Sequence, residues 1–223
     1  MIFVHADGRR RVAPALAGSV VALMLLTGCQ AEADPSATET PDQPSSSAAP
    51  TTAEPSASAS APLTPEPSPA SSAGPAVNIP VPVKPAVADE NSAEGLEAFT
   101  KYWFELFSYG YQTNDWATYD GLTDAGCRTC ANLTGQVRDL YAEGGWIDGG
   151  KIRLNSLQTE FQQNTSGSIN SFVDVEQAEL IYYDAGGIEI DRSEALPSTI
   201  NVSIALWDQG RWIMLDFGSP EGT

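Results

Sequence analysis

The stretch TINVSIALWDQGRWIMLDF, residues 199–217, decides the class of fold. Its first half alternates with a period of two, which places Ile200, Val202, Ile204 and Leu206 on one side and Asn201, Ser203 and Ala205 on the other. This period is typical of a β-strand. The following Asp208-Gln209-Gly210 suits a short hairpin loop, because glycine accepts a left-handed backbone. Residues 211–217 are therefore expected to return as an antiparallel partner strand.

Strand patterns also occur upstream of this hairpin. Residues 151–161 begin with alternating apolar side chains, and residues 171–183 form a longer strand-like run. Asp184-Ala185-Gly186-Gly187 is a turn sequence that leads into a short strand at residues 188–191. Together these segments predict a curved antiparallel sheet of four to five strands.

Helical patterns precede all of the strands. Asn91 and Glu94 have the spacing of a capping box at the start of a helix over residues 92–109. Apolar residues recur there at helical spacing, namely Leu96, Phe99, Trp103, Leu106 and Phe107. A short second helix should begin near Asn114, and a third should run from about residue 125 to residue 143, with Asp124 as its cap. Helices followed by antiparallel strands predict an α+β domain with N-terminal helices packed on one face of the sheet.

The N-terminus resembles the leader of a bacterial lipoprotein. Three arginines precede an apolar run over residues 12–26, which is too short to span a membrane comfortably, since a spanning helix needs about 20 apolar residues. The run ends in Leu26-Thr27-Gly28-Cys29, which resembles a lipobox. The resemblance implies that residues 1–28 are a signal peptide, that Cys29 carries lipid such as palmitate, and that the protein is anchored to the outer face of the cell membrane. An ordinary secretory leader with a chance cysteine is the alternative.

The composition changes after Cys29. Residues 30–90 consist largely of Ser, Ala, Thr and Pro, and they contain 13 of the 16 prolines but no aromatic residue. Such a segment has too little apolar surface to offset the entropy lost on ordering. The composition predicts a disordered linker over residues 29–90, followed by a single domain over residues 91–223.

The charge of that domain limits the possible partners. Residues 91–223 contain 20 Asp and Glu against seven Lys and Arg. Nucleic acid is not expected as a partner, because binding to phosphates depends on Lys and Arg. An acidic surface is also an ordinary means of staying soluble.

Histidine is absent from the predicted mature protein. The single histidine, His5, lies in the predicted signal peptide. The sequence therefore excludes Ser-His-Asp and Cys-His catalysis and the common catalytic zinc sites. We expect neither a metal nor a cofactor, and no residue is assigned a catalytic role.

Several motifs together carry a resemblance to known families. They are Tyr102-Trp103, Asn114-Asp115-Trp116, Cys127-x-x-Cys130 and the glycine pairs Gly144-Gly145 and Gly149-Gly150. The order of elements resembles the nuclear-transport-factor-two-like (SnoaL-like) cone domains, except that the short segment before the third helix leaves no room for a strand usual there. The combination resembles a domain-of-unknown-function family of lipoproteins from high-GC Gram-positive bacteria, over about residues 80–220. The resemblance implies a location and a cone-like shape, but no activity.

Cys127 and Cys130 remain as a pair once Cys29 is taken up by lipid. In the first turn of a helix, residues three apart have Cα atoms ~5 Å apart, within the range of a disulfide. An oxidising compartment outside the membrane favours a structural disulfide. A thiol oxidoreductase centre is the alternative, because a helix N-terminus raises thiol reactivity.

The remaining candidates are aromatic residues that could line the mouth of a cone-shaped pocket, namely Tyr102, Trp103, Tyr183 and Trp207. They could equally fill the hydrophobic core. The expected function is that of an envelope lipoprotein whose domain, displayed on a spacer, binds an unknown small ligand or an envelope protein. A small-molecule enzyme of the isomerase or dehydratase kind is the main alternative, and a Cys-x-x-Cys oxidoreductase is the other.

Overall fold

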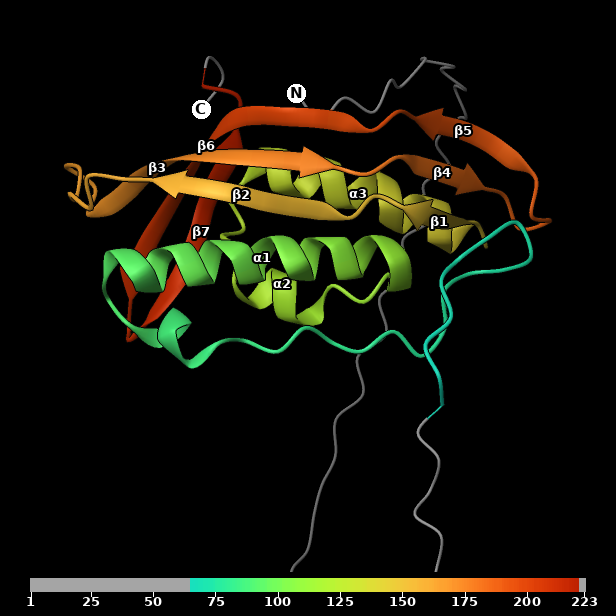
Figure 1. Ribbon diagram of the computed structural model, residues 1–223, viewed down its shortest axis with the longest axis horizontal. Coiled ribbons are helices and arrows are strands. Elements are labelled where there is room, and N and C mark those ends of the chain that lie inside the picture. The colour runs from blue at the N-terminus through green and yellow to red at the C-terminus, as the bar shows by residue number, and fades with distance from the viewer. Residues whose placement is uncertain (1–64, 221–223) are drawn as a thin grey trace, which may run out of the picture. The chain divides into compact units, whose positions relative to one another are not determined.

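The computed structural model describes residues 65–220; the predicted signal peptide, Cys29 and the first part of the predicted linker lie outside this range. The helices are η1 (Ala86–Asp89), α1 (Ala93–Thr113), α2 (Ala117–Gly121) and α3 (Arg128–Ala142). The strands are β1 (Trp146–Gly149), β2 (Ile152–Gln158), β3 (Ser168–Gln177), β4 (Leu180–Tyr183), β5 (Glu189–Ser193), β6 (Leu196–Asp208) and β7 (Arg211–Gly218). The α+β class, with helices before antiparallel strands, is confirmed (Figure 1).

The strands form two antiparallel sheets rather than the single predicted one. The larger sheet has the order β2-β3-β6-β7 and the smaller has the order β1-β4-β5. In Figure 1, β4 and β5 lie beyond the ends of β3 and β6. The predicted strand at residues 171–183 is interrupted at Ala178 and Glu179, so its two halves belong to different sheets. β1 was missed because four residues are too few to show a period.

The three helices begin at residues other than those predicted. Ser92, not Asn91, caps α1, and its Oγ accepts a hydrogen bond of 3.0 Å from the Gly95 N–H. Asn114 adopts a left-handed backbone (φ 56°) that ends α1 instead of starting α2. Asp124 accepts a hydrogen bond from the Gly126 N–H in a turn, which delays the start of α3. Local side-chain hydrogen bonds therefore set these boundaries.

The core lies between α1 and the inner face of the larger sheet. All five apolar positions predicted for the first helix are buried, with Trp103 and Phe107 each 1% exposed. The sheet contributes Val173, Trp212 and Met214, each no more than 1% exposed. Trp212 also donates its indole N–H to the Glu90 carbonyl oxygen, at 2.9 Å. The predicted packing of helix against sheet is thus confirmed.

Strand β6 turns its apolar side away from this core. Asn201, Ser203 and Ala205 are buried, with exposed fractions of 1–3%. The alternate side chains point outward: Ile200 is 51% exposed, and Val202, Ile204 and Leu206 are half-buried. A strand at the centre of a sheet normally buries its aliphatic side. This inversion leaves a row of aliphatic side chains on the outer face of the sheet.

Residues 65–90, which the sequence predicted as linker, are part of the folded structure. Ser68 and Val77 exchange backbone hydrogen bonds of 2.9 and 3.0 Å, and Ala70 packs against Trp146. The Trp146 indole N–H donates to the Ser71 carbonyl oxygen at 2.8 Å. The domain therefore begins earlier than residue 91. The composition did not predict this, because a few small residues of the segment pack against Trp146, which lies far away in the sequence.

Replacing Trp146 with Phe should loosen this N-terminal segment. The ring would still pack, but the hydrogen bond to Ser71 would be lost, which weakens the attachment by about 1 kcal/mol. Limited proteolysis should then cleave within residues 66–77 faster than in the unchanged protein. Trp207→Phe is the control, because Trp207 is half-buried and lies outside the cluster of Ala70 and Trp146. Equal cleavage of all three proteins would show that another contact holds the segment.

Candidate functional site

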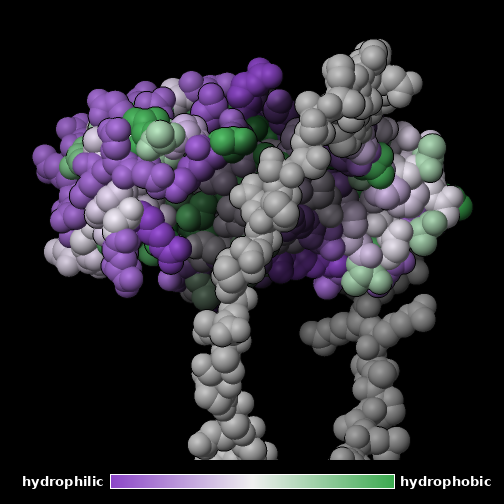
Figure 2. All heavy atoms as spheres, turned by 90° about the horizontal axis from the view of Figure 1, so that it is seen from below, coloured by the Kyte–Doolittle hydropathy of each residue, from purple (hydrophilic) through white to green (hydrophobic). Residues whose placement is uncertain are grey.

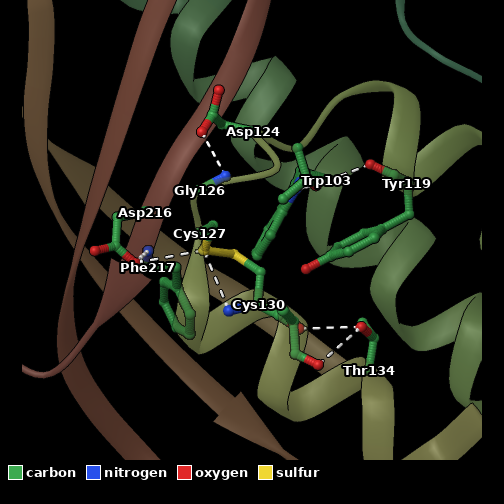
Figure 3. The surroundings of a disulfide bond; sticks show 11 residues. Trp103, Tyr119, Asp124, Gly126, Cys127, Cys130, Thr134, Asp216 and Phe217 are labelled. Atoms are coloured by element: carbon green, nitrogen blue, oxygen red, sulfur yellow. Dashed lines mark hydrogen bonds between the residues drawn. A yellow bond between two sulfur atoms is a disulfide. The ribbon is translucent and has the colours of Figure 1, made fainter.

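Cys127 and Cys130 meet at the start of α3. Their sulfur atoms are at disulfide-bonding distance, and their Cα atoms are 5.3 Å apart. Cys127 is the N-cap residue, and its Sγ accepts a hydrogen bond from the Cys130 N–H at 3.2 Å. Figure 3 shows the pair between Phe217 of β7 on one side and Trp103 of α1 on the other. The disulfide thus closes the first turn of α3 where this helix meets the core.

Burial separates the cysteine pair from solvent. Cys127 is 2% exposed and Cys130 is 3% exposed. Cys127 Sγ also lies 3.4 Å from Asp216 Oδ1 of β7. A thiol exchange centre needs an accessible, readily ionised sulfur. The surroundings therefore fit a structural disulfide better than a redox centre.

Removing the pair should destabilise the domain moderately. Cys127→Ala combined with Cys130→Ala should lower the free energy of unfolding by about 1–3 kcal/mol, because the closed loop is short. Thermal and denaturant unfolding measure this change, and intact mass shows whether the unchanged protein is lighter by two hydrogen atoms than its reduced form. A stability equal to that of the unchanged protein, with loss of a thiol–disulfide exchange activity, would instead support a redox centre.

The four aromatic residues predicted to line a pocket do not share a cavity. Trp103 is inside the core, and its indole N–H donates to Thr123 Oγ1 at 2.8 Å. Tyr183 stacks on Trp146 in a separate small cluster, with ring centroids 5.7 Å apart. Trp207 packs edge-on against Trp212, and Tyr102 borders a surface depression of about 260 Å³. The structure therefore assigns these side chains to packing in different places.

Aromatic rings fill the space beneath the larger sheet. Trp103 has four ring neighbours with centroids 5.0–5.8 Å away, which are Phe104, Phe107, Tyr119 and Phe217. Trp116 extends this cluster, because it packs edge-on against Phe107 and Tyr119. Offset and edge-on contacts of this kind are the favourable arrangements of aromatic side chains. The space between α1 and the larger sheet is therefore occupied by aromatic rings.

The buried tyrosines do not have the properties of catalytic acids or bases. Burial raises the pKa of Tyr111 and Tyr119 well above the ordinary value, and it raises the pKa of Tyr141 to about 12. A general base needs a pKa near the working pH. These phenols therefore stay protonated and act as part of the core.

A surface groove of about 400 Å³ lies between α2 and α3, next to the disulfide. Arg138 lines it and donates two hydrogen bonds to Asp120, at 2.7 and 2.9 Å. The Arg138 guanidinium also lies 5.6 Å from the centre of the Trp116 ring. Asp120 and Trp116 therefore hold this cation at the edge of the groove.

A row of exposed and half-buried apolar side chains lies on the outer side of the larger sheet. Phe172 of β3, which is 56% exposed, lies directly opposite Val202 of β6. On the other flank, Ile213 of β7 lies opposite Leu206. We call this set the outer apolar face; it consists of Phe172, Ile200, Val202, Ile204, Leu206 and Ile213. Six neighbouring apolar side chains on the two central strands and β7 form a contiguous patch, a feature that marks interaction sites.

Polar side chains flank the outer apolar face on both neighbouring strands, with Asn170 of β3 and Asp216 of β7 directly opposite Ile204. Asp174 lies opposite Ile200 and accepts a hydrogen bond from Ser198. Arg153 and Glu176, on β2 and β3, form an ion pair of 3.0 Å. An apolar centre with a polar rim is the usual anatomy of a protein interface. The side of the domain along which residues 78–89 run, the lower side in Figure 1, differs from the outer apolar face. Figure 2 shows mainly hydrophilic residues on that side, with hydrophobic ones scattered among them.

The sequence showed that β6 has an aliphatic side, but it did not show that this side faces away from the core. The alternation over residues 199–207 separates an aliphatic set from a small polar set. Period alone does not show which set faces the core, because that depends on which elements cover the sheet. Phe172 lies in a run, residues 171–183, whose apolar and polar residues do not alternate clearly. The outer apolar face could therefore be recognised only from the fold.

None of the helices within residues 65–220 is long and apolar enough to cross a membrane. The same described residues contain no group of three or more His, Cys, Asp or Glu side chains placed to hold a metal ion.

Comparison with known proteins gives distant structural likenesses and one family. The chain is similar to the intermembrane space region of the chloroplast protein ARC6, with 11% identity and a TM-score of 0.39 over 57% of this chain and 95% of that one. It is also similar to Aln2 from a Streptomyces species, with 10% identity and a TM-score of 0.35 over 57% of this chain and 90% of that one. Likenesses this weak carry no argument about fold or function. No curated protein matches the chain.

The family match coincides with the folded part of the chain. Residues 65–217 match a family of unknown function, DUF6318, so the match starts where the described structure starts. It includes the N-terminal segment, the cysteine pair and the outer apolar face. The chain therefore belongs to the family of unknown function DUF6318.

Proposed function

We propose that this protein is a bacterial envelope lipoprotein, anchored through Cys29, whose α+β domain is a non-catalytic module that binds a protein. The observation that carries the proposal is the outer apolar face. Ile200 and Phe172 are each more than half exposed at the centre of a sheet, where a soluble domain would be expected to place polar side chains. Covering such a face with a partner removes apolar area from water.

The interior of the domain favours binding over catalysis. Aromatic side chains with raised pKa values occupy the space beneath the sheet, and the cysteine pair is buried. An isomerase or dehydratase in this fold would need an open pocket with a carboxylate base. A thiol oxidoreductase would need an accessible sulfur. Both alternatives therefore have less support than a binding module.

The N-terminal sequence supplies the rest of the proposal. Leu26-Thr27-Gly28-Cys29 would fix the chain to the outer face of the membrane, and residues 30–64 would act as a spacer. A flexible coil of about 35 residues has an r.m.s. reach of roughly 33 Å. The domain would thus be displayed at a distance from the membrane where envelope proteins can reach it.

The proposal is tested by photo-cross-linking of the full chain in intact cells. A photoreactive residue is placed at Phe172 in one strain and at Ile190 in another. Ile190 is the matched control, because it is also 56% exposed but lies on β5 of the smaller sheet. A discrete cross-linked protein is expected from position 172 and not from position 190. Products of equal yield from both positions, or none from either, would contradict the proposal.

Lipidation at Cys29 gives a separate prediction. Cys29→Ala should abolish incorporation of labelled fatty acid and leave an uncleaved or mis-cleaved precursor. The expected loss of label is complete, because the acyl chains that anchor the protein, at about 0.8 kcal/mol per buried methylene, are attached at Cys29. Normal labelling of the variant would show that the anchor is elsewhere or that the protein is not a lipoprotein.

A further inference from the structure

We infer that the cleft formed by the ends of β2 and β3 and the loop between them binds a neutral sugar chain. The cleft measures about 450 Å³, which lies within the range of about 300–1,000 Å³ of small-molecule sites. In Figure 1 the β2–β3 loop, residues 159–167, lies at the end of the larger sheet opposite to β4 and β5. The inference adds a site to the proposed function and does not rest on it, although Phe172 borders both surfaces.

Carboxamide side chains make up most of the lining of the cleft. Five of the eight residues that line it carry this group, namely Gln158, Gln162, Gln163, Asn164 and Asn170. Each carboxamide offers two N–H donors and an oxygen acceptor without carrying charge. All five residues are exposed, so a ligand can reach them. A ligand that matches them must both donate and accept hydrogen bonds at several points, as the hydroxyl groups of a sugar do.

The charge of the cleft excludes other classes of ligand. Among the described residues that line it, Glu160 is the one ionised group, and the chain has a net charge of −18. An anionic ligand would meet repulsion with no cation to bind it. A calcium ion needs six to eight oxygen ligands, with more than one carboxylate as a rule. An apolar ligand would bury the carboxamides without hydrogen bonds, which is unfavourable. The lining therefore favours an uncharged, polar ligand.

Phe172 gives the cleft an apolar wall. Its side chain is 56% exposed, and it lies opposite Gln158 in the pairing of β2 with β3. The face of an aromatic ring is negative, so it attracts the polarised C–H groups on the flat side of a sugar ring. An exposed ring beside several carboxamides thus matches the two kinds of surface that a sugar presents, which are C–H groups on its faces and hydroxyl groups around its edge.

Contacts within the loop hold the cleft in shape before a ligand binds. Thr159 Oγ1 donates a hydrogen bond of 3.1 Å to the Asn170 carbonyl oxygen. Asn164 Oδ1 accepts two backbone N–H groups that follow it in the chain, at 2.9 and 3.2 Å. The half-buried ring of Phe161 packs edge-on against Trp212 of the core, with ring centroids 6.2 Å apart. A site that is ordered in advance loses less entropy on binding.

The cleft opens away from the segment that leads into the domain. Ala70 and Ala76 of that segment pack with Trp146 and Tyr183 of the smaller sheet. The β2–β3 loop lies at the other end of the larger sheet (Figure 1). A long sugar chain can therefore occupy the cleft without meeting the N-terminal segment.

The test titrates the chain from residue 30 onward, which keeps every described residue, and follows the side-chain carboxamide signals by NMR. The probes are the tetramer of N-acetylglucosamine, cellotetraose and, as an acidic control, tetragalacturonate. At least one neutral probe should shift the signals of Gln162, Gln163 and Asn170, with a Kd of about 0.1–1 mM. Tetragalacturonate should not shift them, because the cleft and the chain are acidic. Binding of one neutral probe but not the other shows whether the acetamido group is recognised.

Variants place the binding in the cleft. Gln162→Ala combined with Gln163→Ala should weaken binding by about tenfold or more, because two hydrogen-bonding side chains are lost. Phe172→Ala should weaken it by a similar factor, and Phe172→Tyr, which keeps a ring, should not. Asn155→Ala is the matched control, since Asn155 is an exposed carboxamide of β2 outside the cleft. The inference is overturned if neither neutral probe shifts the signals at about 10 mM, if binding survives both the double variant and Phe172→Ala, or if tetragalacturonate binds equally well.

The outcomes separate this inference from the proposed function. Sugar binding without a protein cross-linked from position 172 in cells would support the cleft and contradict the proposed function. A protein cross-linked from position 172 without sugar binding in solution would do the reverse. The double variant at Gln162 and Gln163 should leave the protein cross-link unchanged, because neither residue belongs to the outer apolar face.

Discussion

Replacing Trp103 with Ala should lower the free energy of unfolding by about 3–5 kcal/mol, the range for large-to-small changes in a packed core. Trp103 is 1% exposed and contacts four other rings, so its removal leaves a cavity lined by Phe104, Phe107, Tyr119 and Phe217. It also leaves the Thr123 hydroxyl without its indole donor. A domain of ordinary stability, about 5–15 kcal/mol, would become marginal or unfold.

Trp207→Ala is the matched control for this prediction. Trp207 is only half-buried, and among residues 65–220 it has one ring neighbour, Trp212, at 5.2 Å. Its replacement should therefore cost less than half as much. Denaturant unfolding of the three proteins, followed by far-ultraviolet circular dichroism, gives the two differences. Equal losses, or a smaller loss for Trp103→Ala, would mean that the space beneath the sheet is not closely packed and could hold a ligand.

Gly149→Ala is the second change with a large expected effect. Gly149 ends β1 with φ +85°, and an added Cβ would lie 2.1 Å from the Glu179 carbonyl oxygen. The left-handed backbone alone costs an ordinary residue about 1–2 kcal/mol. The clash with backbone adds about 1–3 kcal/mol, because Glu179 is held at the junction of the two sheets by a hydrogen bond from the Gly150 N–H. We expect a total loss of about 2–5 kcal/mol.

Two other glycines separate the strain from the clash. Gly210→Ala has a similar backbone angle, φ +80°, but meets nothing within 4 Å, so it should show the strain alone. Gly135→Ala lies in α3 with open space around it and should stabilise the helix by about 0.5–1 kcal/mol. Thermal unfolding should therefore rank the variants Gly135→Ala, Gly210→Ala and Gly149→Ala from most to least stable. If Gly149→Ala were as stable as Gly210→Ala, the two sheets would not be joined as described.

The sequence predicted those features of the fold that depend on local patterns. The helical spacing of Leu96, Phe99 and Trp103 identified both α1 and its buried side, because such a period has one interpretation. The hairpin of β6 and β7 was recognisable from its alternation and from Gly210. Cys127 and Cys130 were correctly placed at disulfide distance, since residues three apart in a helical turn are always close.

Other features depend on contacts between distant residues, which no local pattern reports. Ala70 and Ser71 are ordered by Trp146, 75 residues later than Ser71, so their composition alone suggested a linker. The division into two sheets depends on where Gly149 and Glu179 meet. The direction of the aliphatic side of β6 depends on which face α1 covers. The outer apolar face was therefore not predicted, because the sequence does not show which face of the sheet α1 covers.

The claim that the outer apolar face is an interaction surface is tested most directly by hydroxyl-radical labelling of intact cells. Oxidation of Phe172 and Ile200 is compared with that of Ile188 and Ile190, which are 66% and 56% exposed and lie in the β4–β5 turn and within β5. If the face is covered, Phe172 and Ile200 should be protected several-fold in cells relative to the dilute purified chain, while Ile188 and Ile190 react equally in both. Equal oxidation of all four residues in cells and in dilute solution would contradict the claim.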